Sequence, residues 1–155
     1  MIGEAFIMRN RGVAVVTRNG AILMEKLYYE GQYFYAFPGG GIEEGEKPEE
    51  TALRELKEEC GLDGKIIKPL NIVHKKDGSM EYAYEIAVSE EQVAIVGKDP
   101  EFSEEEQMIK DVCWLQLHEI SEKDRAFLWA YGLMEIEEFW DEVMSWGDEI
   151  SYPKK

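Results

Sequence analysis

Residues 40–62 read GGIEEGEKPEETALRELKEECGL, a stretch dense in glutamates and bounded by glycines. On a helix that turns about 100° per residue, Glu55, Glu58 and Glu59 fall within an arc of roughly 100°. The neighbouring arc is apolar and consists of Ala52, Leu53, Leu56 and Cys60. The pattern therefore predicts an amphipathic helix that packs on a sheet along one side and presents carboxylates beside it.

The ends of this helix are marked in the sequence. Pro48 suits the first helical position, where its missing N–H costs nothing, although Lys47 before it is a poor N-cap. Gly61 suits a left-handed C-terminal cap, with Leu62 as its hydrophobic partner. We therefore expect a helix of about thirteen residues that begins at Pro48 and ends just before Gly61.

A glycine-rich stretch, Pro38-Gly39-Gly40-Gly41, precedes the helix and is called the glycine loop below. Because glycine has no side chain, this backbone can approach a ligand closely and turn a carbonyl toward a metal ion. Like charges at positions i, i+3 and i+4 weaken a helix by a few tenths of a kcal/mol per pair, and a bound cation would reverse that cost. Mg²⁺ and Mn²⁺ both prefer oxygen ligands. The loop and the helix are therefore predicted to form two sides of one metal site.

The spacing of these residues resembles the Nudix box of the MutT-like hydrolases. That box is a glycine, five residues, a glutamate, seven residues, and then Arg-Glu-aliphatic-x-Glu-Glu-x-Gly-aliphatic. Every defined position is filled here, by Gly40, Glu46, Arg54, Glu55, Leu56, Glu58, Glu59, Gly61 and Leu62. Taken separately, three glutamates on one helix face are typical of a solvated surface, and three glycines of a turn. The complete pattern favours the functional interpretation.

The resemblance implies a metal-binding and a substrate-binding role for particular residues. Glu55, Glu58 and Glu59 would hold the cation, with the Gly40 carbonyl as a further ligand. Gly39 and Gly40 would lie against the substrate. The cofactor implied is Mg²⁺, with Mn²⁺ as a substitute, because a hard cation makes an attacking water more acidic and neutralises charge on phosphoryl oxygens.

The resemblance also implies the groups that act on the water and position the helix. Glu55 and Glu59 are the catalytic carboxylates, and the proton acceptor is either Glu55 or a carboxylate of the segment 104–106. Arg54 has Glu46 available as an ionic partner, and we interpret this pair as positioning the catalytic helix and loop.

The activity implied is Mg²⁺-dependent hydrolysis of the diphosphate linkage in a nucleoside diphosphate joined to another group. A nucleoside triphosphate pyrophosphohydrolase is favoured over an ADP-sugar pyrophosphatase because the chain reads as one compact domain. A Nudix module that senses nucleotides without hydrolysing them is an alternative, as is an acidic interaction domain that dimerises through its C-terminal aromatic residues. Several aromatic residues either stack on a base or simply pack in strands: Tyr28, Tyr29, Tyr33, Phe34, Tyr35, Tyr82 and Tyr84.

Composition agrees with a single intracellular domain over residues 1–155. The chain is 45% hydrophobic, which suffices for a core without disulfides, so Cys60 and Cys113 are interpreted as small core residues. Neither a signal peptide nor a membrane-spanning run is evident, so we expect a cytoplasmic protein. A net charge of −16 argues against a nucleic-acid polymer or a membrane as partner but permits a small nucleotide that arrives with its cation. A homodimer is compatible with the sequence.

The remaining chain predicts strands before and after the helix. Apolar runs with hairpin signals between them span residues 12–17, 21–28, 33–37, 65–74, 81–88 and 112–117. From Ser121 onward the apolar spacing changes to that of one or two amphipathic helices, which can cover the second face of a sheet. The fold class expected is α+β, a mixed β-sheet sandwiched between helices in the α/β/α arrangement of the Nudix fold.

Overall fold

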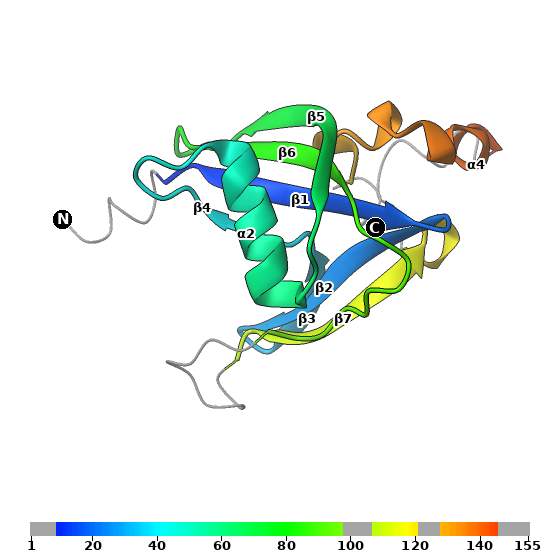
Figure 1. Cartoon of the computed structure of the whole chain (residues 1–155), viewed down its shortest axis with the longest axis horizontal. Helices are drawn as coiled ribbons and strands as arrows, with labels where there is room; N and C mark the ends of the chain where they lie inside the picture. The colour runs from blue at the N-terminus through cyan, green and yellow to red at the C-terminus, as the bar shows by residue number, and fades with distance from the viewer. Residues whose placement is uncertain (1–8, 98–106, 121–127, 146–155) are drawn as a thin grey trace.

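The computed structural model describes residues 9–97, 107–120 and 128–145. The strands are β1 (Arg11–Arg18), β2 (Ala21–Tyr29), β3 (Gln32–Ala36), β4 (Gly39–Gly41), β5 (Lys65–His74), β6 (Met80–Ala87) and β7 (Ile109–Gln116). The helices are α2 (Pro48–Cys60) and α4 (Trp140–Ser145), with short 3-10 turns at Leu117–Glu119, Leu133–Glu135 and Glu137–Phe139. Figure 1 shows α2 lying across the strands, with α4 at one end of the molecule.

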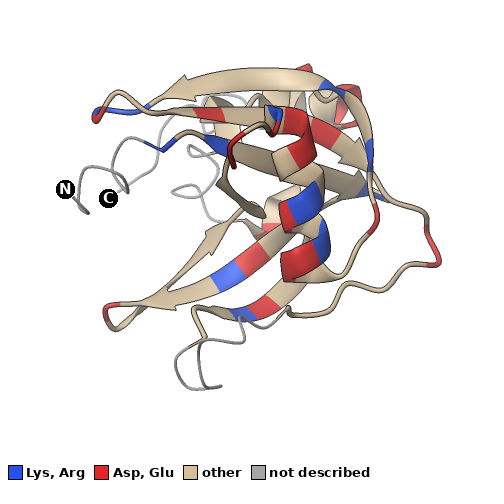
Figure 2. Cartoon of the chain, turned by 60° about the vertical axis from the view of Figure 1, so that its left-hand side comes forward, with Lys and Arg blue, Asp and Glu red and all other residues tan. Residues whose placement is uncertain are grey.

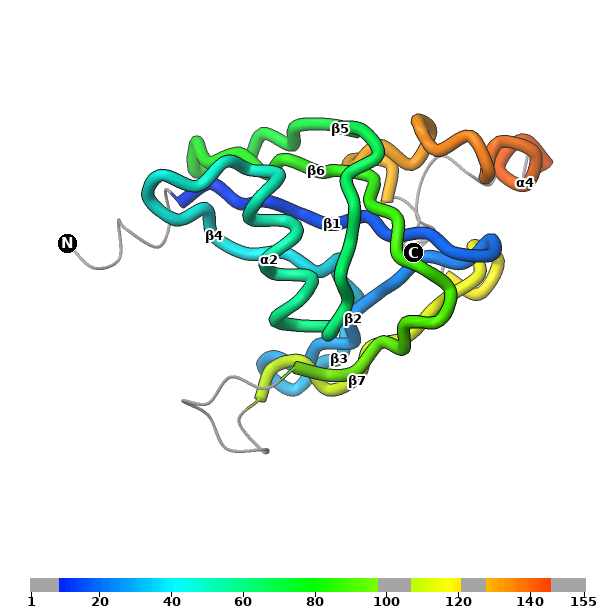
Figure 3. Tube along the Cα trace, viewed as in Figure 1, coloured from blue at the N-terminus to red at the C-terminus, as the bar shows by residue number. Residues whose placement is uncertain are grey.

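The seven strands form one mixed sheet in the order β3-β2-β1-β6-β5, with β4 paired to β1 and β7 paired to β2. Among the strands that the structure describes, β1 and β6 pair in parallel, and the pairings β1–β2, β1–β4, β2–β3, β2–β7 and β5–β6 are antiparallel. The trace in Figure 3 shows α2 lying over one face of the sheet, where it connects β4 to β5 along the chain. This arrangement confirms the mixed sheet expected from the sequence.

The two hairpins predicted by turn residues are present. Asn19 and Gly20 adopt positive φ angles of 52° and 79°, as a two-residue turn of the right twist requires, and they bring Arg18 opposite Ala21. The second turn, between β5 and β6, is closed by the Lys75 N–H, which donates to the Ser79 carbonyl at 2.9 Å. Unlike these two turns, most of the glycine loop is extended, because Gly39–Gly41 forms the short strand β4 paired with β1.

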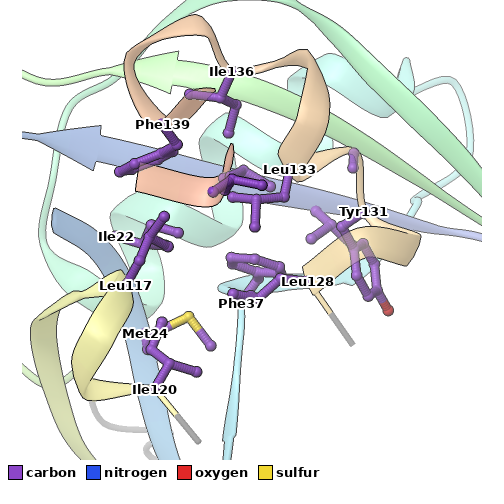
Figure 4. Close-up of a cluster of buried hydrophobic side chains, with 14 residues drawn as sticks. Ile22, Met24, Phe37, Leu117, Ile120, Leu128, Tyr131, Leu133, Ile136 and Phe139 are labelled. Carbon is purple, nitrogen blue, oxygen red and sulfur yellow. The ribbon is translucent and has the colours of Figure 1, made fainter. Parts of the chain in front are cut away.

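Side chains alternate along the central strands, so the sheet buries both faces. On β1, Val13 and Val15 point into a cluster shared with the C-terminal segment, whereas Ala14 and Val16 point into a cluster shared with α2. A strand buried on both faces reads as a continuous apolar run, which is the pattern of residues 12–17. Figure 4 shows the first cluster, in which Phe37 of the β3–β4 connection meets side chains of the C-terminal segment.

The predicted helix is confirmed as α2, thirteen residues from Pro48 to Cys60. Gly61 caps it with a φ of 70°, and Leu62 beyond the cap is fully buried. At the other end, the Glu50 carboxylate accepts a hydrogen bond from the Lys47 N–H at 2.8 Å, which supplies the capping that Lys47 itself does not.

Gly12 sets the distance between α2 and the sheet. A Cβ at this position would lie 2.5 Å from the Pro48 carbonyl oxygen and 3.0 Å from the Ala52 nitrogen, both of them backbone atoms. Only glycine therefore allows β1 to pack so closely against the first turn of the helix.

The C-terminal segment covers the second face as expected. Its described residues are helical at 128–130 and in α4, as predicted, but two 3-10 turns interrupt the helical path between them. Leu133 and Phe139 on the 3-10 turns, Ile136 between those turns and Val143 on the six-residue helix α4 are all buried against the sheet. Trp140 and Met144, which belong to the apolar spacing found from Ser121 onward, are 46% and 71% exposed. Residues 121–127, where the prediction begins, lie outside the described residues.

Two further expectations about burial are settled by the structure. Cys60 is fully buried and Cys113 is partly buried, both as free thiols, as expected of small core residues. Strand β7, expected to be buried, is instead largely half-buried. Over the residues described, we find no helix of sufficient length and apolar character to cross a membrane.

Candidate active site

The glycine loop and α2 meet at two of the predicted carboxylates. The Gly39 N–H donates to Glu59 Oε1 at 3.0 Å, and the Gly40 backbone lies against the Glu55 carboxylate. A Cβ on Gly40 would be 2.5 Å from Glu55 Oε1 and 2.7 Å from its Oε2. The absence of a side chain at Gly40 is therefore what allows Glu55 to reach this position.

Arg54 links the helix, the glycine loop and the acidic turn before the helix. Its Nε donates to Glu46 Oε2 at 2.8 Å, and its second terminal nitrogen donates to Glu46 Oε1 at 3.1 Å and to the Gly41 carbonyl at 3.2 Å. A bidentate guanidinium–carboxylate pair of this kind fixes geometry as well as charge. The hydrogen bonds from Arg54, followed by the one from the Thr51 hydroxyl, lower the pKa of Glu46 to about 2.

Glu58 lies at the edge of this network. Arg54 Nη1 donates to Glu55 Oε1 at 2.8 Å and approaches both Glu58 oxygens at 3.3 Å. The Glu58 side chain is 58% exposed, so it points away from the glycine loop more than Glu55 and Glu59 do. Figure 2 shows acidic and basic residues alternating as red and blue bands along α2.

Glu25 on β2 is a member of the site that the sequence analysis missed. It is only 3% exposed, and the Cys60 thiol donates to its Oε2 at 3.6 Å. It lies beside the half-buried Glu59, and these two carboxylates, called the acidic pair below, lie together behind the glycine loop. A signal was present in the sequence, because Glu25 interrupts an apolar run on a strand buried on both faces, where an ionisable residue is costly.

The carboxylates at this site share an unfavourable environment. Burial is the main cause that raises the pKa of each member of the acidic pair, and the negative charge of Glu25 adds to the rise at Glu59. Burial, followed by repulsion from Glu59, raises the pKa of Glu55 to about 7. Burial also raises the pKa of the Cys60 thiol, which therefore stays protonated and acts as a donor.

The donor set fits a hard divalent cation. Buried carboxylates that repel one another and lie beside a backbone strand of glycines are stabilised in their ionised form by such an ion. In the part of the chain that the structure describes, no three His, Cys, Asp or Glu side chains converge closely enough to form a finished metal site. The reason is visible in the contacts, since Arg54 Nη1 occupies the space between Glu55 and Glu58.

The structure thus brings most of the predicted site together and leaves part of it apart. Gly39, Gly40, Glu55 and Glu59 converge, and Arg54 pairs with Glu46 as expected. Glu58 is directed outward and is held by Arg54. The predicted loop carboxylates, residues 104–106, lie outside the described residues.

The acidic helix α2 packs against the short strand β4, Gly39–Gly41, which is called the glycine strand below. This arrangement, together with the fold, indicates the class of the protein. The NUDIX domain model matches residues 8–135, so the chain belongs to the NUDIX family. The match includes the box residues and the strands on both sides of them.

Curated relatives match only part of this chain. The chain is 46% identical over 61 residues to an RNA pyrophosphohydrolase of Actinobacillus succinogenes, which is 39% of this chain and 30% of that protein. It is 43% identical over 65 residues to an RNA pyrophosphohydrolase of Hamiltonella defensa, which is 42% of this chain and 39% of that protein. The matched region is therefore well under half the length of these relatives.

Solved structures extend the likeness to the whole fold. A NUDIX hydrolase from Nitrosomonas europaea has a TM-score of 0.62 at 14% identity and covers 96% of this chain and 76% of that one. A NUDIX family hydrolase from Clostridium perfringens has a TM-score of 0.58 at 16% identity, over 72% of this chain and 83% of that one. At such low identity these matches show the shared fold alone.

Proposed function

We propose that this chain is a divalent-cation-dependent hydrolase that cleaves the diphosphate linkage of a small nucleotide, with nucleoside triphosphate pyrophosphohydrolysis as its main reaction. The observation that carries the proposal is the convergence of Glu55 and Glu59 on the glycine strand, with Gly39 bonded to Glu59 and Gly40 packed on Glu55. Family membership supports the same reaction class.

The residues would act as follows. Glu55 and Glu59 would hold the cation, joined by Glu58 once it turns from Arg54 and by the Gly40 carbonyl. When bound, Mg²⁺ supplies positive charge against the phosphoryl oxygens and increases the acidity of the attacking water. Among the described carboxylates, Glu55 would be the proton acceptor, because it lies directly against the Gly40 backbone at the glycine strand.

Arg54 and Glu46 would hold α2 and the glycine strand in register while the reaction proceeds. Because Arg54 contacts Glu46, Glu55 and the Gly41 carbonyl, it connects the three parts of the site. Glu25 would orient Glu59 from behind, as a buried partner that a ligating carboxylate commonly has. We further propose that residues 1–155 form a single domain and that the protein is cytoplasmic. The free thiols of Cys60 and Cys113 agree with a reducing compartment.

Two substrates compete with a nucleoside triphosphate. RNA is suggested by the names of the curated relatives, but a net charge of −16 opposes binding of a polyanion. An ADP-sugar is the other, because the box residues bind phosphates and leave the attached group undetermined. We favour the small triphosphate because it carries its own neutralising cation to an acidic surface.

Two alternatives without hydrolysis predict different behaviour. A nucleotide-sensing module would bind nucleotides without turnover, although it would have no need for an intact set of box glutamates. An acidic interaction domain would dimerise through exposed apolar residues of α4, Trp140 and Met144, and would not depend on metal. Size-exclusion chromatography with and without Mg²⁺ separates this last alternative from the others.

The test is a hydrolysis panel with Mg²⁺ and with a chelator. The substrates are ATP, GTP, ADP-ribose, and a short RNA with a 5′-triphosphate, and the products measured are nucleoside monophosphate, diphosphate and phosphate. We compare the wild type with Glu59→Gln, and with Glu49→Gln as a charge-matched control on the first turn of the same helix.

We expect metal-dependent release of diphosphate from a nucleoside triphosphate, at least about a hundredfold slower in Glu59→Gln and nearly unchanged in Glu49→Gln. Turnover that is unaffected by the chelator, or full activity in Glu59→Gln, would contradict the mechanism. Preferential cleavage of the RNA or of ADP-ribose would replace the substrate while keeping the mechanism. Nucleotide binding without turnover would support the sensing module.

A further inference from the structure

The chain that follows β6 returns to the helix that carries the box glutamates. Residues 89–97, called the clamp segment below, come after β6 and lie at the C-terminal end of α2. Figure 3 shows this part of the chain, in green, passing that end of the helix. None of these residues belongs to the Nudix box, so the last turn of α2 contacts a part of the chain that the spacing of the box does not indicate.

The clamp segment supplies backbone donors to the last turn of α2. The final four carbonyls of a helix have no partner within it. The Ile95 N–H donates to the Cys60 carbonyl at 2.9 Å, and the Gly97 N–H donates to the Glu59 carbonyl at 2.7 Å. The last turn of a helix commonly frays, whereas this one is held by a segment that is distant in the sequence.

This turn carries two of the proposed metal ligands, Glu58 and Glu59. The Glu59 carboxylate accepts a hydrogen bond from the Gly39 N–H at 3.0 Å, while the Glu59 backbone carbonyl accepts one from Gly97. Glu59 is therefore held both at its side chain and at its backbone. If the turn frayed, the carboxylate would lose its position, because the backbone from which it extends would move.

Gly97 lies so close to the helix that no side chain fits between them. A Cβ at this position would be 1.9 Å from the Glu58 carbonyl oxygen and 3.0 Å from the Glu59 Cα, both of them backbone atoms. Ordinary van der Waals contact begins at 3.4 Å. Gly97 is not among the residues with positive φ, so its own conformation would accept alanine. The close approach to the helix is therefore what requires glycine here.

Two side chains hold the clamp segment in place. Gln92 pairs with the backbone of Asp63, just beyond the helix cap, accepting from its N–H at 2.7 Å and donating to its carbonyl at 2.9 Å. Arg18 on β1 donates through Nη1 to the carbonyls of Ser89 at 3.1 Å and Gln92 at 2.8 Å. Its guanidinium carbon lies 4.3 Å from the centre of the Trp114 ring on β7. A planar cation stacked on an indole ring is well fixed, so the clamp segment is anchored to the sheet.

We propose that the clamp segment positions the metal ligands Glu58 and Glu59 by holding the last turn of α2, with Gly97 as the positioning residue. This inference rests on the proposed function, because it names what keeps two of the metal ligands in place. Gly97 acts through the backbone of these two residues. The ordinary alternative is that the clamp segment only stabilises the fold, and that alternative predicts a different result for metal binding.

The first test measures Mn²⁺ binding to the metal-free protein by calorimetry. Gly97→Ala forces the clamp segment away from the helix, so it should weaken Mn²⁺ binding at least about tenfold, as the loss of groups that orient ligands does. The matched control is Gly132→Ala, which places a Cβ 2.8 Å from the Leu70 Cβ at a glycine with a φ of 93°. That site adjoins the cluster on the face of the sheet away from α2.

The control should lower the melting temperature and keep the wild-type affinity for Mn²⁺. Equal loss of Mn²⁺ affinity in Gly97→Ala and Gly132→Ala would assign the effect to stability alone and overturn the proposal. Wild-type Mn²⁺ affinity in Gly97→Ala would overturn it as well.

The second test locates the loosened turn by hydrogen exchange of the metal-free protein, measured by NMR. In Gly97→Ala, the amides of residues 58–61 should exchange at least about tenfold faster, while those of residues 52–55 should exchange as in the wild type. Val93→Ala is the control within the clamp segment, because Val93 is 75% exposed, and it should leave both groups unchanged. Equally faster exchange throughout α2 in Gly97→Ala would indicate general destabilisation and overturn the proposal.

A further variant guards against loss of folding in Gly97→Ala. Gln92→Ala removes the two hydrogen bonds to Asp63 without adding any atoms. It should weaken Mn²⁺ binding severalfold and lower kcat at low Mn²⁺ concentration, and excess Mn²⁺ should restore kcat because the ligands are displaced but present. Thermal melting reports whether the variant is folded. Wild-type Mn²⁺ affinity in a folded Gln92→Ala protein would count against the positioning role.

The outcomes separate this inference from the proposed function. If no nucleotide is hydrolysed but Gly97→Ala loosens the last turn and weakens Mn²⁺ binding, the proposed function fails and the positioning role stands. If nucleotides are hydrolysed and Gly97→Ala binds Mn²⁺ as the wild type does, the positioning role fails and the hydrolase stands.

Discussion

Gly40→Ala is the substitution whose effect the structure defines best. A Cβ at this position would lie 2.5 Å from Glu55 Oε1 and 2.7 Å from Oε2, whereas ordinary van der Waals contact begins at 3.4 Å. Gly40 is not among the residues with positive φ, so alanine fits its backbone without strain. The substitution should therefore move the Glu55 carboxylate by almost 1 Å and leave the fold otherwise intact.

The size of the effect follows from that displacement. A catalytic group misplaced by about 1 Å costs on the order of a hundredfold in rate, or about 2.7 kcal/mol of transition-state stabilisation. The free energy of unfolding should change by less than about 1 kcal/mol, because alanine also reduces the entropy of the unfolded chain.

The assay is metal-dependent nucleotide hydrolysis together with thermal unfolding of the same protein. The matched control is Gly41→Ala, whose Cβ would meet only the flexible side chain of Arg9 among its three nearest atoms. We expect that control to retain activity within about threefold of the wild type, as surface substitutions usually do. Equal activity of Gly40→Ala and the wild type would refute the claim that Gly40 exists to admit Glu55.

Three further predictions concern the charges around the site. Arg54→Lys loses the bidentate bond to Glu46, so it should lower kcat/KM at least about tenfold. It should also lower the free energy of unfolding, measured by denaturant titration, by about 1–3 kcal/mol. No change in either quantity would contradict the positioning role. Glu25→Gln removes one charge of the acidic pair, so it should stabilise the metal-free protein at pH 8. It should also weaken Mn²⁺ binding, measured by calorimetry, about tenfold. Unaltered Mn²⁺ affinity would refute the role of Glu25. In chelator, the raised pKa of Glu55 contributes stability that is present below pH 4.5 and is lost as pH rises through about 7. The melting temperature should therefore fall over this range, and the fall should be shallower in Glu55→Gln. An equally steep fall in Glu55→Gln would exclude Glu55 as its source.

Local signals allowed much of the fold to be predicted from the sequence. Pro48, Gly61 and the apolar stripe determine α2 within the chain itself, so its length and its cap were predicted correctly. The turn at Asn19 and Gly20 likewise determines the first hairpin. These features depend on neighbours along the chain, and the sequence displays those neighbours directly.

Features that depend on distant contacts were predicted less well. The spacing from Ser121 onward indicated one or two amphipathic helices, but after Gly132 the described segment bends into short turns that let Leu133, Ile136 and Phe139 reach the sheet. Periodicity alone could not reveal this, because the shape of the covered face decides the path.

The same limit applies to the site. The box carboxylates were found from spacing along one helix, whereas Glu25 joins them only because β2 runs behind the C-terminal half of α2. Glu58 lies on the predicted helix face, but its bond to Arg54 directs it outward. Sequence spacing identifies residues of one element, and tertiary structure decides which residues of other elements complete the site.

The most direct test of the account is anomalous diffraction from a crystal of the protein soaked with Mn²⁺. We predict a peak within coordination distance of the Glu55 and Glu59 carboxylates and the Gly40 backbone, with Arg54 withdrawn from Glu58. Saturating Mn²⁺ that leaves this position without a peak, or that binds only at exposed acidic residues elsewhere, would contradict the central claim that α2 and the glycine strand form a metal site for hydrolysis of a diphosphate linkage.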